Sequence, residues 1–201
     1  ILKLQFEHWP HIRLLRSVDD DENAAKLTPE ERSVLKMCQA LAYQYGTAWK
    51  LDKQKMRDVY TDFVQKVDWA PGASDLLMAI NNHRSGSLGY SEALHTVLSL
   101  MKIPCIMVHG RSHQGAHAWN LVRRANGRWY HAAAAMDDAA GKTSEHTFKY
   151  FLRCDDEVAK ELVWDLEETH PTPLKSQKRA NEYGLLDRRR EPEHVPEPEN
   201  A

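Results

Sequence analysis

The side chains that could do chemistry lie between residues 84 and 138. Ser87 stands in a small Gly/Ser-rich turn that opens an apolar helix, and His117 follows a β-branched strand, within Ala-His-Ala-Trp-Asn. A helix N-terminus presents unpaired backbone N–H groups and the positive end of the helix dipole. A thiol placed there beside an imidazole becomes a strong nucleophile, and the first-turn amides can stabilise an oxyanion. The pattern predicts a nucleophile-and-base site, provided that residues 87 and 117 meet across one cleft.

The order of these segments resembles the core of the transglutaminase-like superfamily, including its bacterial protease-like members. In that superfamily a Cys at the helix start, the His of a His-Ala-Trp motif and an Asp on the next strand form a triad. Carried over by position, the Cys falls on Ser87, the His on His117 and the Asp on Ala133. The resemblance extends over roughly residues 28–171. Its further matches are Ser91-Glu92-Ala93-Leu94, Ile103-Pro104-Cys105, Phe151-Leu152-Arg153-Cys154-Asp155 and Trp164-Asp165.

The resemblance implies acyl transfer or peptide-amide cleavage through a thioester, but two of the three expected groups are absent. An alkoxide at Ser87 is harder to form than a thiolate, and Ala133 offers His117 neither a hydrogen bond nor a charge. Loss of the whole triad in subtilisin lowers turnover by about 10⁶. We therefore expect a catalytically impaired domain, with Ser87 acting as a helix N-cap. Slow Ser87-dependent hydrolysis or acyl transfer is the alternative.

Two nearby carboxylates could be considered as substitutes for the missing one. Asp137 and Asp138 lie four and five residues after Ala133, roughly 13 to 17 Å away along an extended strand. They can serve His117 only if the chain folds back.

The impaired domain is expected to keep its groove as a binding site for a protein, peptide or glycopeptide. Trp119 and Tyr90 are the residues predicted to contact such a substrate. No cofactor is implied. A competing hypothesis is a zinc or nickel site, because neutral imidazoles are common metal ligands. Four histidines would form it: His109, His113, His117 and His131.

Composition sets broad limits on the molecule. The 201 residues, 42% hydrophobic and 28% charged, suit one domain with tails. We predict an N-terminal extension over 1–26 that packs loosely, a transglutaminase-like domain over 27–171 and a disordered Pro-, Glu- and Arg-rich tail over 172–201. The first residue is Ile1, which suggests a processed or truncated chain and leaves the compartment open, with a lean toward a secreted or cell-envelope protein.

Charge argues against a nucleic-acid partner, and hydropathy argues against a membrane-spanning segment. A net charge of −2 with a pI near 6.6 leaves no electrostatic footprint for nucleic acid, and no apolar run approaches the roughly 20 residues of a membrane span. The three cysteines are widely spaced without a Cys-x-x-Cys pair, so neither a disulfide framework nor a Cys-based zinc site is indicated.

The predicted fold is α+β and papain-like, with N-terminal helices and a nucleophile-position helix packed on an antiparallel sheet. Thr28-Pro29 with Glu31 predicts a capped helix that ends at Gly46. A second helix is expected after Asp52, and a short one after Ser74.

The second half of the chain is expected to supply the sheet. A buried strand is predicted over 103–108, a polar loop over 110–115 and a hairpin that turns near 126–127. A two-residue turn there would place Ala133 opposite Asn120, and the four alanines 132–135 are poor strand formers. A helix is predicted within residues 148–159, starting at Phe148.

Overall fold

The computed structural model describes residues 9–46, 53–72, 75–125, 127–139, 141 and 148–164. The helices are α2 (Pro10–Arg16), α3 (Asp21–Ala25), α4 (Pro29–Tyr45), α5 (Lys53–Lys66), α6 (Leu76–Asn81), α7 (Ser87–Leu100), α8 (Ala134–Ala139) and α9 (Asp155–Val158). The strands are β1 (Asp68–Trp69), β2 (Arg84–Ser85), β3 (Cys105–Ser112), β4 (Gly115–Arg123), β5 (Trp129–Ala132), β6 (Phe151–Arg153) and β7 (Leu162–Trp164).

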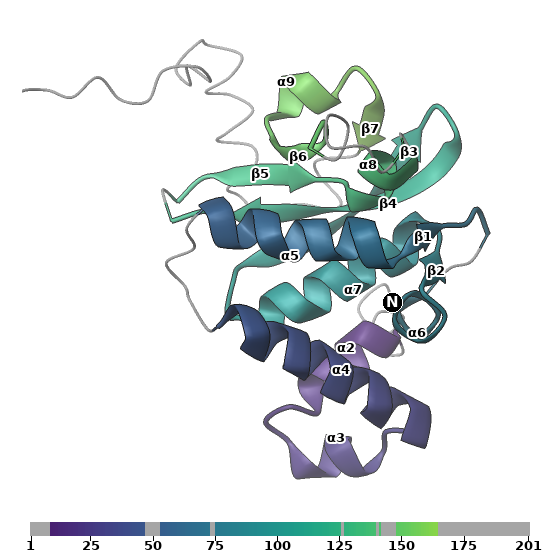
Figure 1. The fold of residues 1–201 in the computed structure, drawn as a ribbon, viewed down its shortest axis with the longest axis vertical. Helices are drawn as coiled ribbons and strands as arrows, with labels where there is room; N and C mark the ends of the chain where they lie inside the picture. The colour runs from purple at the N-terminus through teal and green to yellow at the C-terminus, as the bar shows by residue number, and fades with distance from the viewer. Residues whose placement is uncertain are drawn as a thin grey trace, which may run out of the picture.

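Five of these strands form one sheet in the order β6-β5-β4-β3-β7, and every neighbouring pair is antiparallel. Helices α5 and α7 lie along the sheet, while α2 and α4 lie on the other side of α7 and α3 lies farthest from the sheet (Figure 1). The short strands β1 and β2 pair in parallel outside this sheet. The α+β arrangement predicted from the sequence is confirmed, with the helix that begins at Ser87 packed against strand β4 of an antiparallel sheet.

Helix α7 is the centre of the core because nearly its whole circumference is buried, mostly by apolar side chains. Ala93, Leu94, Val97 and Leu98 are each fully buried. The helix also packs closely at its first turn, where a Cβ on Gly89 would lie 2.4 Å from the carbonyl oxygen of Asp75. Only glycine fits there, so α6 can approach the end of α7 that carries residue 87.

Helix α4 forms as the sequence predicts. The Thr28 hydroxyl accepts from the Glu31 amide, and the Glu31 carboxylate accepts from the Thr28 amide, which completes the capping box. Gly46 follows the helix with a φ of +78°. Asp52, predicted to cap α5, lies outside the described residues, as does Ser74. The N-cap of α6 is Asp75, whose carboxylate accepts from the Met78 amide.

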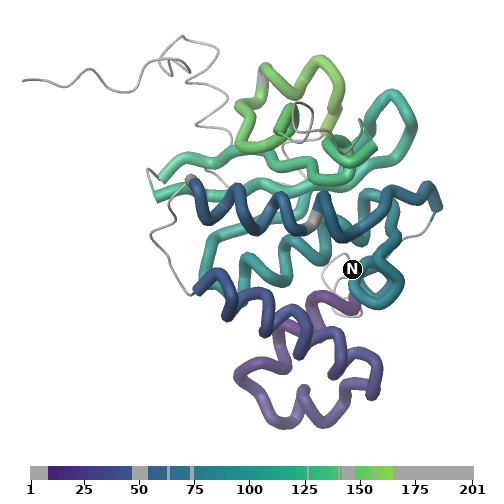
Figure 2. Tube along the Cα trace, viewed as in Figure 1, coloured from purple at the N-terminus to yellow at the C-terminus, as the bar shows by residue number. Residues whose placement is uncertain are grey.

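The loose packing expected of residues 1–26 does not describe residues 9–26. Helix α2 packs on α7, where Leu14 is fully buried and His11 is 2% exposed. Figure 2 shows this N-terminal part of the trace beside α4, on the far side of α7 from the sheet. Residues 1–8 are not described, and the division of the chain at 26 and 171 stays a prediction.

The prediction of a polar loop over 110–115 is wrong. Strand β3 continues to Ser112 and β4 begins at Gly115, so only two residues make the turn. Gly110 pairs with His117, and a Cβ on Gly110 would lie 2.3 Å from the Val163 carbonyl oxygen. The glycine read from sequence as a loop signal thus marks close contact between β3 and β7.

The register of β4 and β5 differs by one residue from that of a two-residue turn. Asn120 pairs with Ala132, and Ala133 lies just beyond the strand. Helix α8 begins at Ala134, as expected for alanines, which favour helix over strand. The prediction that a helix begins at 148 is also wrong, because residues 151–153 form β6 before the short helix α9.

Candidate active site

Ser87 is the first residue of α7, and it is not the N-cap. Gly86 holds that position and supplies no side-chain cap. The half-buried Ser87 side chain instead faces strand β4, where its Oγ accepts a hydrogen bond of 3.1 Å from the Ala118 amide. The residue at the nucleophile position is therefore tied to the strand that carries His117.

His117 lies in β4, one residue before Ala118, whose amide donates that bond. It is 7% exposed, and its Nε2 atom is buried without a hydrogen-bond partner among the described residues. Its ring centroid lies 6.4 Å from that of Trp69 and 6.2 Å from that of Trp119. Burial, with a smaller contribution from His113, lowers the pKa of His117 to about 4. The imidazole is therefore neutral near pH 7, and no carboxylate in the part of the chain that the structure describes is bound to it.

Ala133 occupies the third predicted position and is 1% exposed. Its amide donates to the Tyr150 carbonyl oxygen at 3.1 Å, which attaches this end of β5 to the segment before β6. The methyl side chain provides no acceptor for an imidazole N–H.

The two nearby carboxylates bind elsewhere. Asp137 accepts from the Tyr60 hydroxyl, a short contact, and from the Tyr150 amide at 3.1 Å. Asp138 accepts from the Trp69 amide at 2.6 Å and from the Tyr90 hydroxyl at 2.8 Å. Burial raises the pKa of Asp137 to about 6. Helix α8 does turn the chain back, but both carboxylates support the fold there.

Two cavities flank His117. One, of about 490 Å³, is lined by Ser87 and His117 together with residues of the turn after β1; the other, of about 260 Å³, extends toward Lys149 and Glu161. Trp69, Gln114 and His117 line both cavities. The structure thus brings Ser87 and His117 to one cleft, as the sequence required, with room for a ligand on each side of the imidazole.

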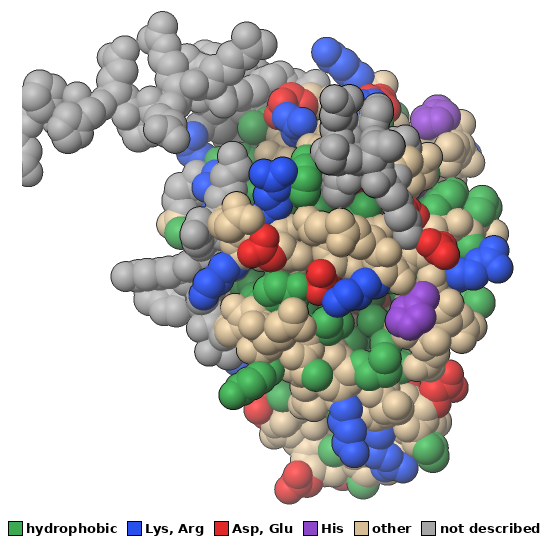
Figure 3. Space-filling model, in the orientation of Figure 1, with side chains coloured by type: hydrophobic (Ala, Val, Ile, Leu, Met, Phe, Trp, Pro, Cys, Tyr) green, Lys and Arg blue, Asp and Glu red, His purple; other side chains and the backbone are tan. Residues whose placement is uncertain are grey.

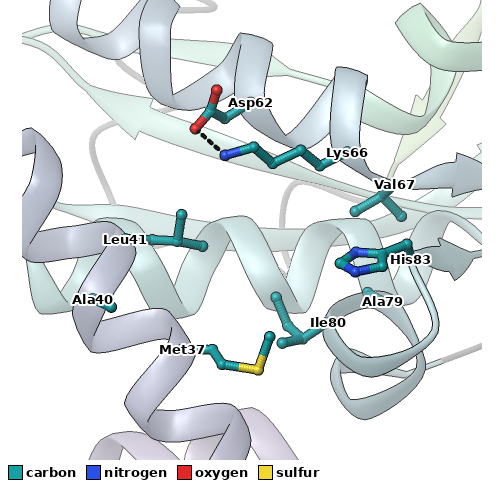
Figure 4. Close-up of a pocket in the computed structure, with 9 residues that line it drawn as sticks. All are labelled: Met37, Ala40, Leu41, Asp62, Lys66, Val67, Ala79, Ile80 and His83. Atoms are coloured by element: carbon teal, nitrogen blue, oxygen red, sulfur yellow. Dashed lines mark hydrogen bonds and ion pairs between the residues drawn. The ribbon is translucent and has the colours of Figure 1, made fainter.

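Another cavity of about 260 Å³ lies between α4, α5 and α6, and its lining does not include Ser87 or His117. Its lining is mainly apolar, with Met37, Leu41 and Ile80 facing one another and the Asp62–Lys66 ion pair along one side (Figure 4). Figure 3 shows hydrophobic side chains gathered on this face between α4 and α5. This pocket offers hydrophobic contact but no paired nucleophile and base.

Trp119 and Tyr90, predicted to contact substrate, are each 1% exposed and line neither cavity at His117. The Trp119 indole N–H donates to His131 Nδ1 at 2.8 Å. The Tyr90 hydroxyl contacts the Val67 carbonyl oxygen and Asp138. Both side chains support the frame behind the site in this structure. The surface residue that sequence reasoning missed is Trp69, which lines both cavities and had no distinguishing pattern around it.

A second buried histidine was considered from sequence only as a metal ligand. His131 is fully buried, with Nδ1 accepting from Trp119 and Nε2 lying 2.9 Å from Asp155 Oδ1. Because an indole N–H can only donate, Nδ1 is the acceptor and Nε2 carries the proton. This arrangement occupies both ring nitrogens and explains why His131 is buried.

The four histidines proposed as a metal site are not brought together. His131 is bound to Trp119 and Asp155, His109 packs against Trp9 with ring centroids 5.1 Å apart, and His113 lies in the β3–β4 turn. Over the described ranges no group of three or more His, Cys, Asp or Glu side chains is arranged to hold a metal ion. In the same ranges, no helix is long and apolar enough to cross a membrane.

Neither a protein-family model nor a curated protein matches this chain. Among solved structures it is similar to one described as a TGase, with 13% identity, a TM-score of 0.46, and coverage of 59% of this chain and 35% of that one. A putative cysteine protease from Cytophaga hutchinsonii has 14% identity, a TM-score of 0.43, and coverage of 56% and 44%. Calcium-bound LapG of Legionella pneumophila has 10% identity, a TM-score of 0.47, and coverage of 80% and 96%.

The chain thus spans less than half the length of the first two structures. At these identities and TM-scores, no statement about activity follows from the likeness.

Proposed function

We propose that this chain is a transglutaminase-like domain of thiol acyltransferase or peptidase ancestry. In this proposal it is catalytically impaired, because Ser87 and Ala133 stand at the Cys and Asp positions, and its cleft at His117 binds a peptide or glycopeptide. The observation that carries the proposal is the buried Nε2 atom of His117, which has no hydrogen-bond partner among the described residues although its ring lines the same cavity as Ser87. Buried polar groups are normally hydrogen-bonded, so this nitrogen supports the proposal that a former partner is missing.

The register of the sheet supports Ala133 as the place of that partner. Asn120 pairs with Ala132, so continuing the ladder by one residue would put Ala133 opposite Trp119 and diagonal to His117. Diagonal neighbours in an antiparallel pair lie about 7 to 8 Å apart between Cα atoms, within reach of longer side chains. An aspartate at 133 could accept a proton-bearing nitrogen of His117, whereas alanine cannot.

The same geometry explains the expected loss of rate. A serine nucleophile needs a base that can accept its proton and whose cation is stabilised. The pKa of His117 is lowered to about 4 by burial, and among the described residues no carboxylate is bound to the ring. His117 is therefore a weak base for a hydroxyl, and a Ser87-dependent reaction should be close to silent.

The two cavities on either side of His117 support peptide binding. Their walls combine aromatic, amide and charged side chains, and they lie along the rim between the start of α7 and the β3–β4 turn. An extended peptide could place neighbouring side chains in the two cavities, with its backbone passing the imidazole. Binding of labelled peptide libraries to the natural chain, with Trp69→Ala as a cleft variant, tests this part directly.

Restoration of both lost groups tests the ancestry. Ser87→Cys with Ala133→Asp should produce a thiolate at 87 that reacts with iodoacetamide near neutral pH, because the helix N-terminus and His117 stabilise the anion. Ser87→Cys alone is the matched control and should need higher pH. Mass spectrometry of the peptide containing residue 87 separates it from the natural thiols, of which burial raises the pKa of Cys38 to about 12. Absence of selective alkylation at 87 would count heavily against the proposal.

The second candidate is slow Ser87-dependent acyl transfer or hydrolysis. It is favoured by one observation, that Ser87 and His117 line the same cavity. An active-site-directed acylating probe should then label the natural chain at Ser87. Labelling that persists in Ser87→Ala would exclude this candidate.

A further inference from the structure

Three hydrogen bonds join helix α7 to strand β4 next to the cleft. The Ala118 amide donates to Ser87 Oγ at 3.1 Å, the Ser91 hydroxyl donates to the Trp119 carbonyl oxygen at 3.0 Å, and the Asn120 side-chain amide donates to the Ser91 carbonyl oxygen at 3.0 Å. Helix–strand contacts are usually apolar, so buried hydrogen bonds that run in both directions between α7 and β4 call for a role.

The Ser91–Asn120 pair is buried and specific. Each residue is 1% exposed, so water does not compete for these bonds. Asn120 also reaches Cys105 Sγ at 3.6 Å, which extends the connection to strand β3. Removing the Ser91 hydroxyl would take one bond from the buried Trp119 carbonyl oxygen, and removing the Asn120 amide would take one from the buried Ser91 carbonyl oxygen, so the arrangement is sensitive to small shifts.

The spacing of the contacts matches the two elements. Ser87 and Ser91 are one turn apart on the same face of α7, about 6 Å along the axis at 1.5 Å per residue. Ala118 and Asn120 are two residues apart in β4, about 6.6 Å at 3.3 Å per residue. Two attachments with matched spacing fix both the position and the tilt of the helix, which one contact could not do.

From this geometry we infer that Ser91 and Asn120 are positioning residues that set the separation between the side chain at 87 and the imidazole of His117. Neither lines the cavities beside His117, so they act through α7 and β4 and do not touch a ligand. The inference rests on the proposed function, because its chemical consequence appears only when residue 87 is a nucleophile.

The main experiment uses the chain that carries Ser87→Cys and Ala133→Asp, to which Ser91→Ala or Asn120→Leu is added. The rate of alkylation at residue 87 is measured against pH. Each added change should raise the midpoint of the profile by about one unit, equivalent to a roughly tenfold lower rate at pH values well below the midpoint, because the thiol moves away from the imidazole. Circular dichroism and thermal melts show which variants remain folded.

Thr96→Val is the matched control. Thr96 is fully buried on the same helix, but its hydroxyl donates to the Glu92 carbonyl oxygen within α7 at 2.8 Å and joins no strand. Thr96→Val should leave the pH profile of residue 87 unchanged. A profile that Ser91→Ala and Asn120→Leu do not move, or that Thr96→Val moves equally, would overturn the inference.

A second measurement, on the natural chain, keeps the inference testable if the restored thiol proves unreactive. Hydrogen exchange of the Ala118 amide reports the Ser87 bond directly. Ser91→Ala or Asn120→Leu should speed that exchange at least about tenfold, whereas Thr96→Val should not. Unreactive thiol with faster exchange would refute the proposed function alone, while unchanged exchange would refute the positioning role.

Discussion

Two histidines on neighbouring strands have opposite surroundings. His131 in β5 is fully buried, and both of its ring nitrogens are bonded, to Trp119 and Asp155. His117 in β4 is almost as buried, yet its Nε2 atom has no partner among the described residues and its ring borders two cavities. The first arrangement is typical of a residue kept for stability. The second leaves a ring that can interact with a ligand in either cavity.

The largest expected effect is a difference in the free energy of unfolding between alanine variants of these two histidines. His131→Ala should lower the free energy of unfolding by about 3 to 5 kcal/mol, because it leaves the Trp119 indole N–H and the Asp155 carboxylate without their partner in a buried region. His117→Ala, the matched change, should cost about 1 kcal/mol, since no bond to Nε2 is lost. Urea denaturation measures both, and equal losses would erase the distinction.

A smaller change sharpens the account of His131. Asp155→Asn keeps the shape and one acceptor oxygen but removes the negative charge that faces Nε2. We expect a loss of about 1 to 2 kcal/mol in the free energy of unfolding, because a charge-assisted hydrogen bond becomes a neutral one. If the variant proves more stable than the natural chain, the carboxylate is not the partner that stabilises His131.

The protonation of His117 tests its missing partner. In the natural chain its NMR titration should have a midpoint near pH 4, because burial disfavours the imidazolium. The folded pKa lies below the ordinary value of 6.5, so this residue's contribution to stability is complete above that value and is lost as pH falls toward 4. Ala133→Asp should raise the midpoint by at least about one unit. An unchanged midpoint would show that residue 133 does not face the ring.

The smallest expected effect concerns the serine. Ser87→Ala removes the acceptor of the Ala118 amide, but the cavity beside it can admit water to that amide. The free energy of unfolding should therefore fall by only about 0.5 to 1 kcal/mol. A loss well beyond 2 kcal/mol in thermal or urea unfolding would mean that Ser87 has a structural role that the proposal does not contain.

Local chemistry made much of this molecule predictable. The capping box of α4 and the apolar residues of α7 depend on neighbours within a few residues, so the sequence alone predicted both helices. The four alanines at 132–135 prefer helix for the same local reason, and the sequence already argued against a strand there. The order of segments also predicted that residues 87 and 117 meet at one cleft, and they do.

Long-range contact decided the rest. The sequence indicated a loop at Gly110, but the approach of β7 makes that glycine part of a strand. It suggested a loose N-terminal segment, but helix α2 is held by a buried His11–Glu92 pair that joins residues 81 positions apart. It proposed a substrate contact at Trp119, but His131 holds that indole in the core.

The sequence by itself determined which chemical groups exist, with a hydroxyl at Ser87, an imidazole at His117 and a methyl at Ala133. Only the tertiary structure decided which histidine is satisfied and which is left with an unpartnered nitrogen. Side-chain identity is written in the chain, whereas hydrogen-bond satisfaction depends on pairs such as 119 with 131, and 131 with 155, that only the packed sheet brings together.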